Sequence, residues 1–284
     1  MTLLLAILVL SGPPTTAGGA PAAPQRPEDG GAAFAAALAA GERAFAQRAD
    51  PARLSEAVAL LARAAALRPA DVRAQLSLAR AQAFRAQSHL DAALEAWREA
   101  SSAAERALRA AAPEWAAAID RGEDPARAVA VVRPAGAEPL YWLALATMGM
   151  AQARGMVAVL AVRDAVRAMM ERAAELDERT DHGGPRRALG AWLAALPAAA
   201  GGGPGAAREQ LERARTLAPS YQLARVREAE TLAVLLQDRR RFEALLGEVL
   251  AFDGSAAPEI GPENRLATRL ARELLARRES LFYP

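Results

Sequence analysis

Residues 166–232 read VRAMMERAAELDERTDHGGPRRALGAWLAALPAAAGGGPGAAREQLERARTLAPSYQLARVREAETL, and this stretch decides the fold. It contains one spaced pattern twice, with apolar or small residues separated by steps of four and three. Those steps place the residues on one stripe of a helix, and a position five residues later marks its end. The pattern recurs twice nearer the N-terminus. The four occurrences are Ala57-Leu61-Ala64-Pro69, Ala93-Trp97-Ala100-Glu105, Val166-Met170-Ala173-Glu178 and Ala207-Leu211-Ala214-Pro219. The repetition indicates stacked pairs of helices.

The composition of the 284 residues favours an all-α fold. Alanine and leucine are strong helix formers, and β-branched residues are sparse. Only 5% of the residues are aromatic, so helices must meet largely through alanine and leucine with their backbones close together. We predict about a dozen antiparallel helices and no strand, in a single domain over residues 32–284.

The charge pattern argues against nucleic-acid binding. The 35 basic residues are all arginine and are opposed by 33 acidic residues, which gives a net charge of +2. Arginine and glutamate alternate along the predicted helices, as on a solvated surface, and no long basic stripe is present. The chain has no cysteine, which excludes disulfides, thiolate nucleophiles and cysteine-ligated zinc.

Catalysis has little support in the sequence. The two histidines, His89 and His182, lie far apart and fit no metal-binding spacing. The glycine-rich run at residues 201–205 lacks the lysine of a phosphate-binding loop. We therefore predict a non-enzymatic protein without a cofactor, and keep as a weaker hypothesis an enzyme that uses carboxylates in a central cavity.

The N-terminus resembles an export signal. Leu3 to Leu10 form an apolar run that is too short to span a bilayer but suits a signal-peptide core. No basic residue precedes it, so a disordered apolar start is the alternative. We assign residues 1–17 to a signal-like segment and residues 18–31 to a flexible Pro/Gly/Ala-rich leader. Pro13 stands where a bacterial lipobox has its cysteine, so we expect an exported chain without a lipid anchor.

The spacing Ala-x3-Leu-x2-Ala-x4-Pro is similar to the second-helix half of a tetratricopeptide repeat. Leu189-Gly190 resembles the Leu-Gly pair of the first-helix half. The intervals between repeats are unequal, so the repeat is degenerate. A more specific resemblance, to the T-component proteins of tripartite ATP-independent periplasmic (TRAP) transporters, covers residues 137–284 well and residues 32–110 loosely. It is carried by Tyr141-Trp142, Met169-Met170, Leu176-Asp177, Gly183-Gly184-Pro185, Leu189-Gly190, Pro197, Gly202-Gly203, Ala214, Pro219, Phe242, Leu245-Leu246, Pro262-Glu263-Asn264, Leu274-Leu275 and Leu281-Phe282.

This resemblance implies a periplasmic, all-helical protein of degenerate repeats around a central pore with hydrophobic lining. It also implies assembly into a homo-oligomer, with a trimer as the expected form. This assembly would dock a periplasmic solute-binding protein, the P-component. The implied ligand is a small hydrophobic molecule. The alternative is a general repeat scaffold that binds a peptide or an envelope protein and has no role in transport.

One predicted helical hairpin supplies candidate pore-lining residues. Methionine adapts to irregular apolar ligands, and several methionines concentrate here beside two aromatic residues. Ordinary core packing is the alternative. The candidates are Tyr141, Trp142, Met148, Met169 and Met170.

The turn Gly183-Gly184-Pro185 is a candidate loop at a pore mouth or partner surface, with a tight helix–helix connection as the alternative. Leu189, Gly190 and Pro219 are expected to be structural, as is Asn264. Asn264 caps the last helix or, as the resemblance implies, bonds to the repeat stack.

Overall fold

A computed structural model describes residues 27–88 and 93–283. Within these ranges the chain forms helices and short turns, with no strand, which confirms the predicted all-α repeat array. The longer helices are α1 (Pro27–Ala46), α2 (Pro51–Leu67), α3 (Val72–Gln87), α4 (Ala93–Ala111), α7 (Ala137–Arg154), α8 (Met156–Asp177), α9 (Thr180–Ala195), α10 (Pro204–Leu217), α12 (Arg239–Ala251) and α13 (Gly261–Ala276). The shorter ones are α5 (Pro113–Asp120), α6 (Pro125–Ala128), α11 (Leu223–Glu228) and α14 (Arg278–Leu281).

The helix boundaries follow local sequence signals. The side chains of Asp50 and Asp71 accept hydrogen bonds from the first-turn amides of α2 and α3, as predicted. Gly155 separates α7 from α8 with a φ of 96°, a conformation that glycine adopts without strain. The predicted cap at Asp91, like His89, lies outside the described residues.

Three boundaries differ from the sequence predictions. α1 begins at Pro27, inside the stretch assigned to the leader, while the signal-like segment lies outside the described residues. The predicted last helix divides at Arg277 into α13 and α14. α11 continues as a π-helical turn over Ala229–Ala233, a variation that side-chain periodicity does not encode.

The repeated stripe is the packing surface of the array. Nearly all of its apolar positions are below 2% exposed, because close helix contacts require small residues that leave no gap. The buried members are Ala57, Leu61, Ala64, Ala100, Val166, Met170, Ala173, Ala207, Leu211 and Ala214. Ala93 and Trp97 are the exceptions, since both are only partly buried.

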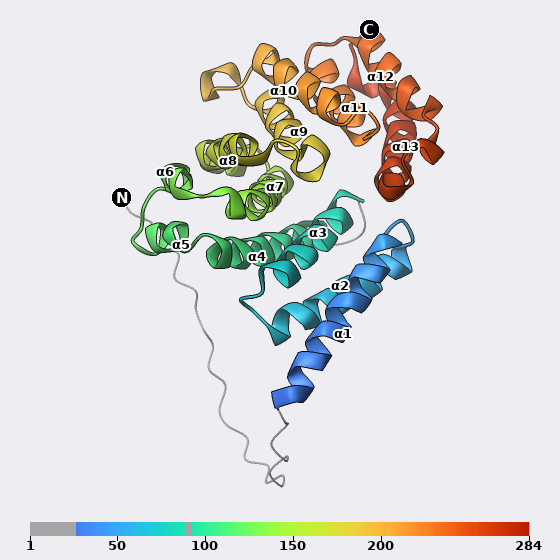
Figure 1. Cartoon of the computed structure of the whole chain (residues 1–284). Coiled ribbons are helices and arrows are strands. Elements are labelled where there is room, and N and C mark those ends of the chain that lie inside the picture. The colour runs from blue at the N-terminus through green and yellow to red at the C-terminus, as the bar shows by residue number, and fades with distance from the viewer. Residues whose placement is uncertain (1–26, 89–92, 284) are drawn as a thin grey trace, which may run out of the picture.

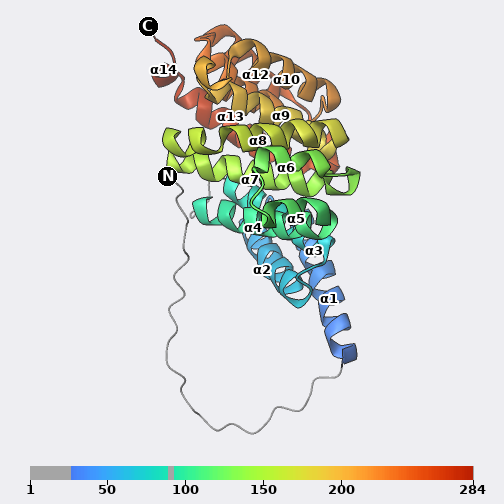
Figure 2. The same cartoon turned by 90° about the vertical axis from the view of Figure 1, so that its left-hand side faces the viewer.

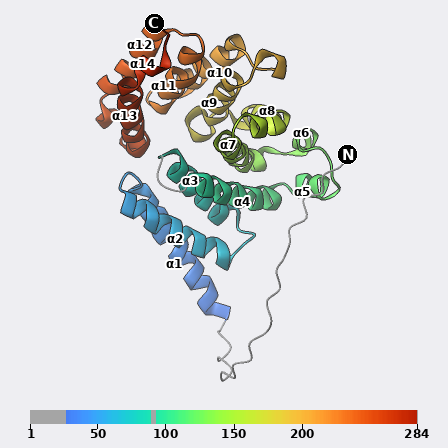
Figure 3. The same ribbon diagram turned by 180° about the vertical axis from the view of Figure 1, so that it is seen from behind.

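The helix pairs α1/α2, α3/α4, α7/α8 and α9/α10 lie in successive layers, as Figure 2 shows edge-on. The layers curve, so that α13 comes back beside the α1–α2 turn and the end of α3 (Figure 1). The short helices α5 and α6 lie on the side opposite to α13 (Figure 3). The apolar cluster of the C-terminal helices also includes Leu54 and Phe84, from α2 and α3. The two ends of the array therefore share a core.

Candidate functional site: a passage inside the helical array

A cavity of about 550 Å³ lies between α3, α4, α7, α9 and α11. We call it the apolar chamber, because most of its wall comes from apolar side chains. Trp97 forms part of the wall, and its ring lies against Gly149, where a Cβ atom would be only 2.4 Å away. Further aliphatic lining residues are Ala86, Ala93, Leu145, Met148, Ala153, Ala188 and Ala191. A cavity of this size and character matches sites that hold small apolar molecules.

A narrow space of about 20 Å³, which we call the neck, follows the apolar chamber. Gln87 lines both spaces. Trp142, Asp181 and Tyr221 form further parts of the neck, and Phe84 contributes from α3. The volume suffices for about one water molecule. The neck is therefore far smaller than the apolar chamber.

A second large space, of about 440 Å³, lies beyond the neck. We call it the polar chamber, because charged side chains make up much of its wall. It shares Arg80, Asp181 and Glu263 with the neck. The neck thus shares lining residues with both chambers, and together we call the three spaces the passage.

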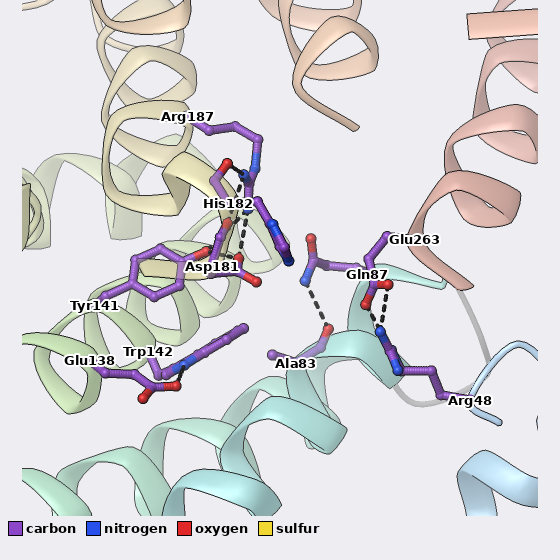
Figure 4. Close-up of polar contacts among 10 residues, drawn as sticks. All are labelled: Arg48, Ala83, Gln87, Glu138, Tyr141, Trp142, Asp181, His182, Arg187 and Glu263. Carbon is purple, nitrogen blue, oxygen red and sulfur yellow. Dashed lines mark hydrogen bonds and ion pairs between the residues drawn. The ribbon is translucent and has the colours of Figure 1, made fainter. Parts of the chain in front are cut away.

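A buried hydrogen-bond network surrounds Asp181 at the neck (Figure 4). The Tyr141 hydroxyl donates to Asp181 Oδ2 at 2.6 Å, and Arg187 Nη2 donates to the same oxygen at 2.7 Å. The Arg187 guanidinium also lies 4.5 Å from the centre of the Tyr221 ring. The His182 ring also stacks on the Tyr221 ring, with 5.0 Å between the two ring centres.

The backbone of the α9 N-terminus is bent so that Asp181 reaches this position. Asp181, His182 and Gly183 have φ values of 47°, 55° and 79° in succession. Such values cost energy in non-glycine residues and persist only where other contacts hold them. Arg187 supplies those contacts, because its Nη1 donates to the carbonyl oxygens of Asp181 and His182 at 3.2 Å each.

Burial and neighbouring charges determine the protonation of this network. Burial, followed by the nearby Asp181 carboxylate, raises the pKa of Tyr141 well above its ordinary value. The pKa of Tyr221 is raised for the same two reasons. Burial alone would lower the pKa of Arg187, but Tyr221, Tyr141 and Asp181 raise it. Both tyrosines are therefore uncharged at neutral pH, and Arg187 is a permanent cation.

An ion pair, which we call the clasp, joins the two ends of the array beside the neck. Arg48 follows α1 and donates to Glu263 of α13 through Nε at 2.7 Å and Nη2 at 2.5 Å (Figure 4). The side chains are each 12% exposed. Arg48 also lies over the Phe45 and Phe84 rings, 4.6 and 5.5 Å from their centres.

The predicted lining residues divide into two groups. Tyr141 and Met148 line the apolar chamber, and Trp142 lines the neck. Met169 and Met170 line none of these spaces. Both lie on α8 and are buried in the core, as in the alternative of ordinary core packing.

The predicted loop residues are interior. Gly183, Gly184 and Pro185 are all buried at the start of α9, so the tight-connection alternative describes their surroundings. A Cβ on Gly183 would lie 3.2 Å from the Ala214 carbonyl oxygen, and one on Gly184 would lie 2.6 Å from the Tyr141 hydroxyl oxygen.

Of the four residues expected to be structural, Leu189, Gly190 and Asn264 are buried and Pro219 is exposed. Leu189 is 3% exposed, and Gly190 packs against Leu211 of α10. Pro219 follows α10 and accepts a hydrogen bond from the Gln222 side chain. Asn264 does not cap α13. Its side-chain oxygen accepts a hydrogen bond from the backbone N–H of Gln222 at 3.0 Å, which is a bond to the repeat stack.

Sequence reasoning missed most of the polar residues at the neck. Asp181, Arg187, Gln87 and Arg48 come from three different parts of the chain and match no local motif, and Glu263 appeared only within the resemblance. The available signal was Asp181-His182 directly before two glycines, which is typical of a left-handed turn. Across the part of the chain that the structure describes, no group of three or more acidic, histidine or cysteine side chains is arranged to hold a metal ion.

The fold and the passage define the chain as a helical-repeat protein built around an internal cavity. A family model described as the TRAP transporter T-component matches residues 70–282. This match spans most of the chain, so the chain belongs to the TRAP transporter T-component family, and the resemblance found in its sequence is confirmed. A comparison with curated proteins finds no match. Among the described residues, no helix combines the length and apolar character needed to cross a membrane.

Proposed function

We propose that this chain is an exported, non-catalytic subunit of a TRAP-type transporter that holds a small hydrophobic ligand in its passage. Membership of the T-component family supports the association with a transporter. The apolar chamber carries the ligand part of the proposal, because a largely apolar space of about 550 Å³ has the size and character of a small-molecule site.

The proposed partner is a periplasmic solute-binding protein, the P-component, which delivers or receives the ligand. The concave surface of a curved repeat array is typical of such recognition. We further propose that the chain forms a homo-oligomer, with a trimer as the first expectation. Native mass spectrometry of the chain, alone and mixed with a TRAP-type solute-binding protein from the same organism, tests both assemblies. Capture of varied peptides without that protein would favour the general scaffold instead.

Filling the apolar chamber tests ligand binding directly. Ala153 lines the chamber and is exposed, so Ala153→Trp adds bulk without disturbing the core. We expect the variant to weaken the binding of an uncharged probe such as decanol at least tenfold, because the indole occupies the same space. Ala161→Trp on α8, exposed and remote from the chamber, is the matched control. Equal affinities in titration calorimetry would contradict the proposal.

A further inference from the structure

The start of α8 carries an exposed apolar surface. Residues 156–162 read MVAVLAV and contain no polar side chain, yet Val159 is the only one of the seven that is buried. Met156 is 51% exposed and Val157 is 85% exposed, the highest values for large non-aromatic apolar side chains in the described ranges. Single exposed apolar residues are common, but a consecutive run at the surface indicates contact with another molecule. We call residues 156–162 the apolar tip.

Only positive charge adjoins the exposed end of the apolar tip. No carboxylate occurs between Glu138 and Asp164, and the charged residues in that interval are Arg154 and Arg163 alone. Arg163, at the far end of the tip, pairs with Asp164 at 3.3 Å. Arg154 is exposed, precedes the tip across Gly155, and forms no ion pair with any residue in the described ranges. An apolar segment beside a cation is complementary to a layer of anionic lipids, which joins hydrocarbon to negatively charged headgroups.

The size of the apolar tip fits a bilayer better than a protein partner. A stable protein interface uses roughly 20–30 residues on each side. The tip offers seven residues, of which only Met156, Val157 and Ala161 are exposed. At about 1.5 Å per residue, a helical segment of this length extends about 10 Å. Apolar helix faces enter the boundary between headgroups and acyl chains to a depth of about 5–10 Å, so the tip has the length for shallow insertion.

We propose that the apolar tip inserts into the surface of an anionic phospholipid bilayer, with Arg154 at the level of the headgroups. Gln152 and Ala153, at the end of α7, line the apolar chamber, so this contact brings the chamber to the membrane surface. The inference goes beyond the proposed function, since it requires neither a ligand nor a solute-binding protein.

Because the sequence contains no cysteine, a single introduced thiol reports on the tip directly. Val157→Cys is labelled with the polarity-sensitive fluorophore NBD, and Ala62→Cys, exposed on α2, is the matched control. With vesicles of equimolar phosphatidylglycerol and phosphatidylcholine, the emission at position 157 should increase and shift to the blue, because the fluorophore leaves water. The label at position 62 should not respond. An unchanged spectrum at position 157 would overturn the proposal.

Vesicle sedimentation of unlabelled variants separates the apolar part of the contact from the charged part. Val157→Asp should weaken binding roughly tenfold or more, because a carboxylate replaces the most exposed aliphatic side chain. The variant should fold, since an acidic residue in the first turn of α8 suits the helix dipole. Val131→Asp, at a 41% exposed position, is the matched control and should bind like the wild type. Arg154→Gln should weaken binding to the anionic vesicles about fivefold and leave binding to pure phosphatidylcholine vesicles unchanged.

A second copy of the chain as the occupant of the apolar tip is an outcome of the same measurements. If the label at position 157 shifts with protein concentration in the absence of vesicles, and vesicles cause no further change, the tip is an interface between copies and the membrane proposal is wrong. Equal sedimentation of Val157→Asp and the wild type would also show that the tip does not insert. Neither outcome affects the proposed function, which decanol binding to the wild type and Ala153→Trp tests separately.

Discussion

At the scale of single residues, the neck depends on a glycine that sequence analysis assigned to a turn. Gly184 lies so close to Tyr141 that a Cβ atom would be 2.6 Å from both Cζ and the hydroxyl oxygen. Tyr141 is fully buried and bonded to Asp181, so it has little freedom to move away. Because Gly184 has no side chain, Tyr141 has room to form its hydrogen bond with Asp181.

Gly184→Ala should consequently destabilise the chain. Overpacking of a rigid core costs roughly 1–3 kcal/mol, and we expect a loss of unfolding free energy in that range by urea denaturation. Gly205→Ala, in the first turn of α10 with open space around the glycine, is the control and should be neutral or slightly stabilising. Equal stability of the two variants would show that Tyr141 is not held as the structure shows.

At the scale of elements, Glu178 connects three helices. It follows α8 and pairs with Arg186 of α9 at 3.1 Å and with Arg213 of α10. Hydrogen bonding from Arg213, together with the charges of Arg213 and Arg186, lowers the pKa of Glu178. Because the folded pKa lies below the unfolded value of about 4.3, the contact stabilises the fold above that value and is lost as the pH falls through the folded pKa.

Glu178→Gln should therefore show a pH-dependent defect. At pH 7 we expect its unfolding free energy to fall below that of the wild type by roughly 0.5 kcal/mol, as for partly exposed ion pairs. The difference should shrink toward zero as the pH is lowered below about 4. Glu209→Gln on α10, which removes a carboxylate with no ion pair in the described structure, should behave like the wild type. A difference that stays constant from pH 7 to pH 3 would contradict the assigned role.

At the scale of the whole molecule, the clasp holds the ends of a long array together. Arg48 and Glu263 are 215 positions apart in the chain, and their contact lies beside the neck. Arg269 of α13 adds a second link by donating to the Ser88 carbonyl oxygen at 2.7 Å. A repeat array is otherwise stabilised mainly between neighbouring layers, so these contacts determine whether the curve closes.

Glu263→Gln should open this closure. It leaves a largely buried Arg48 without its counter-charge, which costs roughly 1–3 kcal/mol. We expect faster amide exchange in the α1–α2 turn than in the wild type. Glu279→Gln on α14, which removes an exposed ion pair with Arg239, is the control. Replacing both Arg48 and Glu263 by methionine should recover most of the stability, because no buried charge is then left unpaired. Unchanged exchange in Glu263→Gln would show that the clasp does not hold the ends together.

The sequence by itself determined the helices, most of their boundaries and the stripe on which they pack. Each of these depends on residues within a turn or two of one another: caps such as Asp50, breaks such as Gly155, and the steps of four and three that bury Leu61, Met170 and Leu211. The tertiary structure alone decided where the passage runs. Its neck brings together Gln87, Trp142, Asp181 and Glu263, because the angle between each helix pair and the next accumulates until the last helix meets the first turn. That angle depends on side-chain packing between layers, which no local spacing in the chain records.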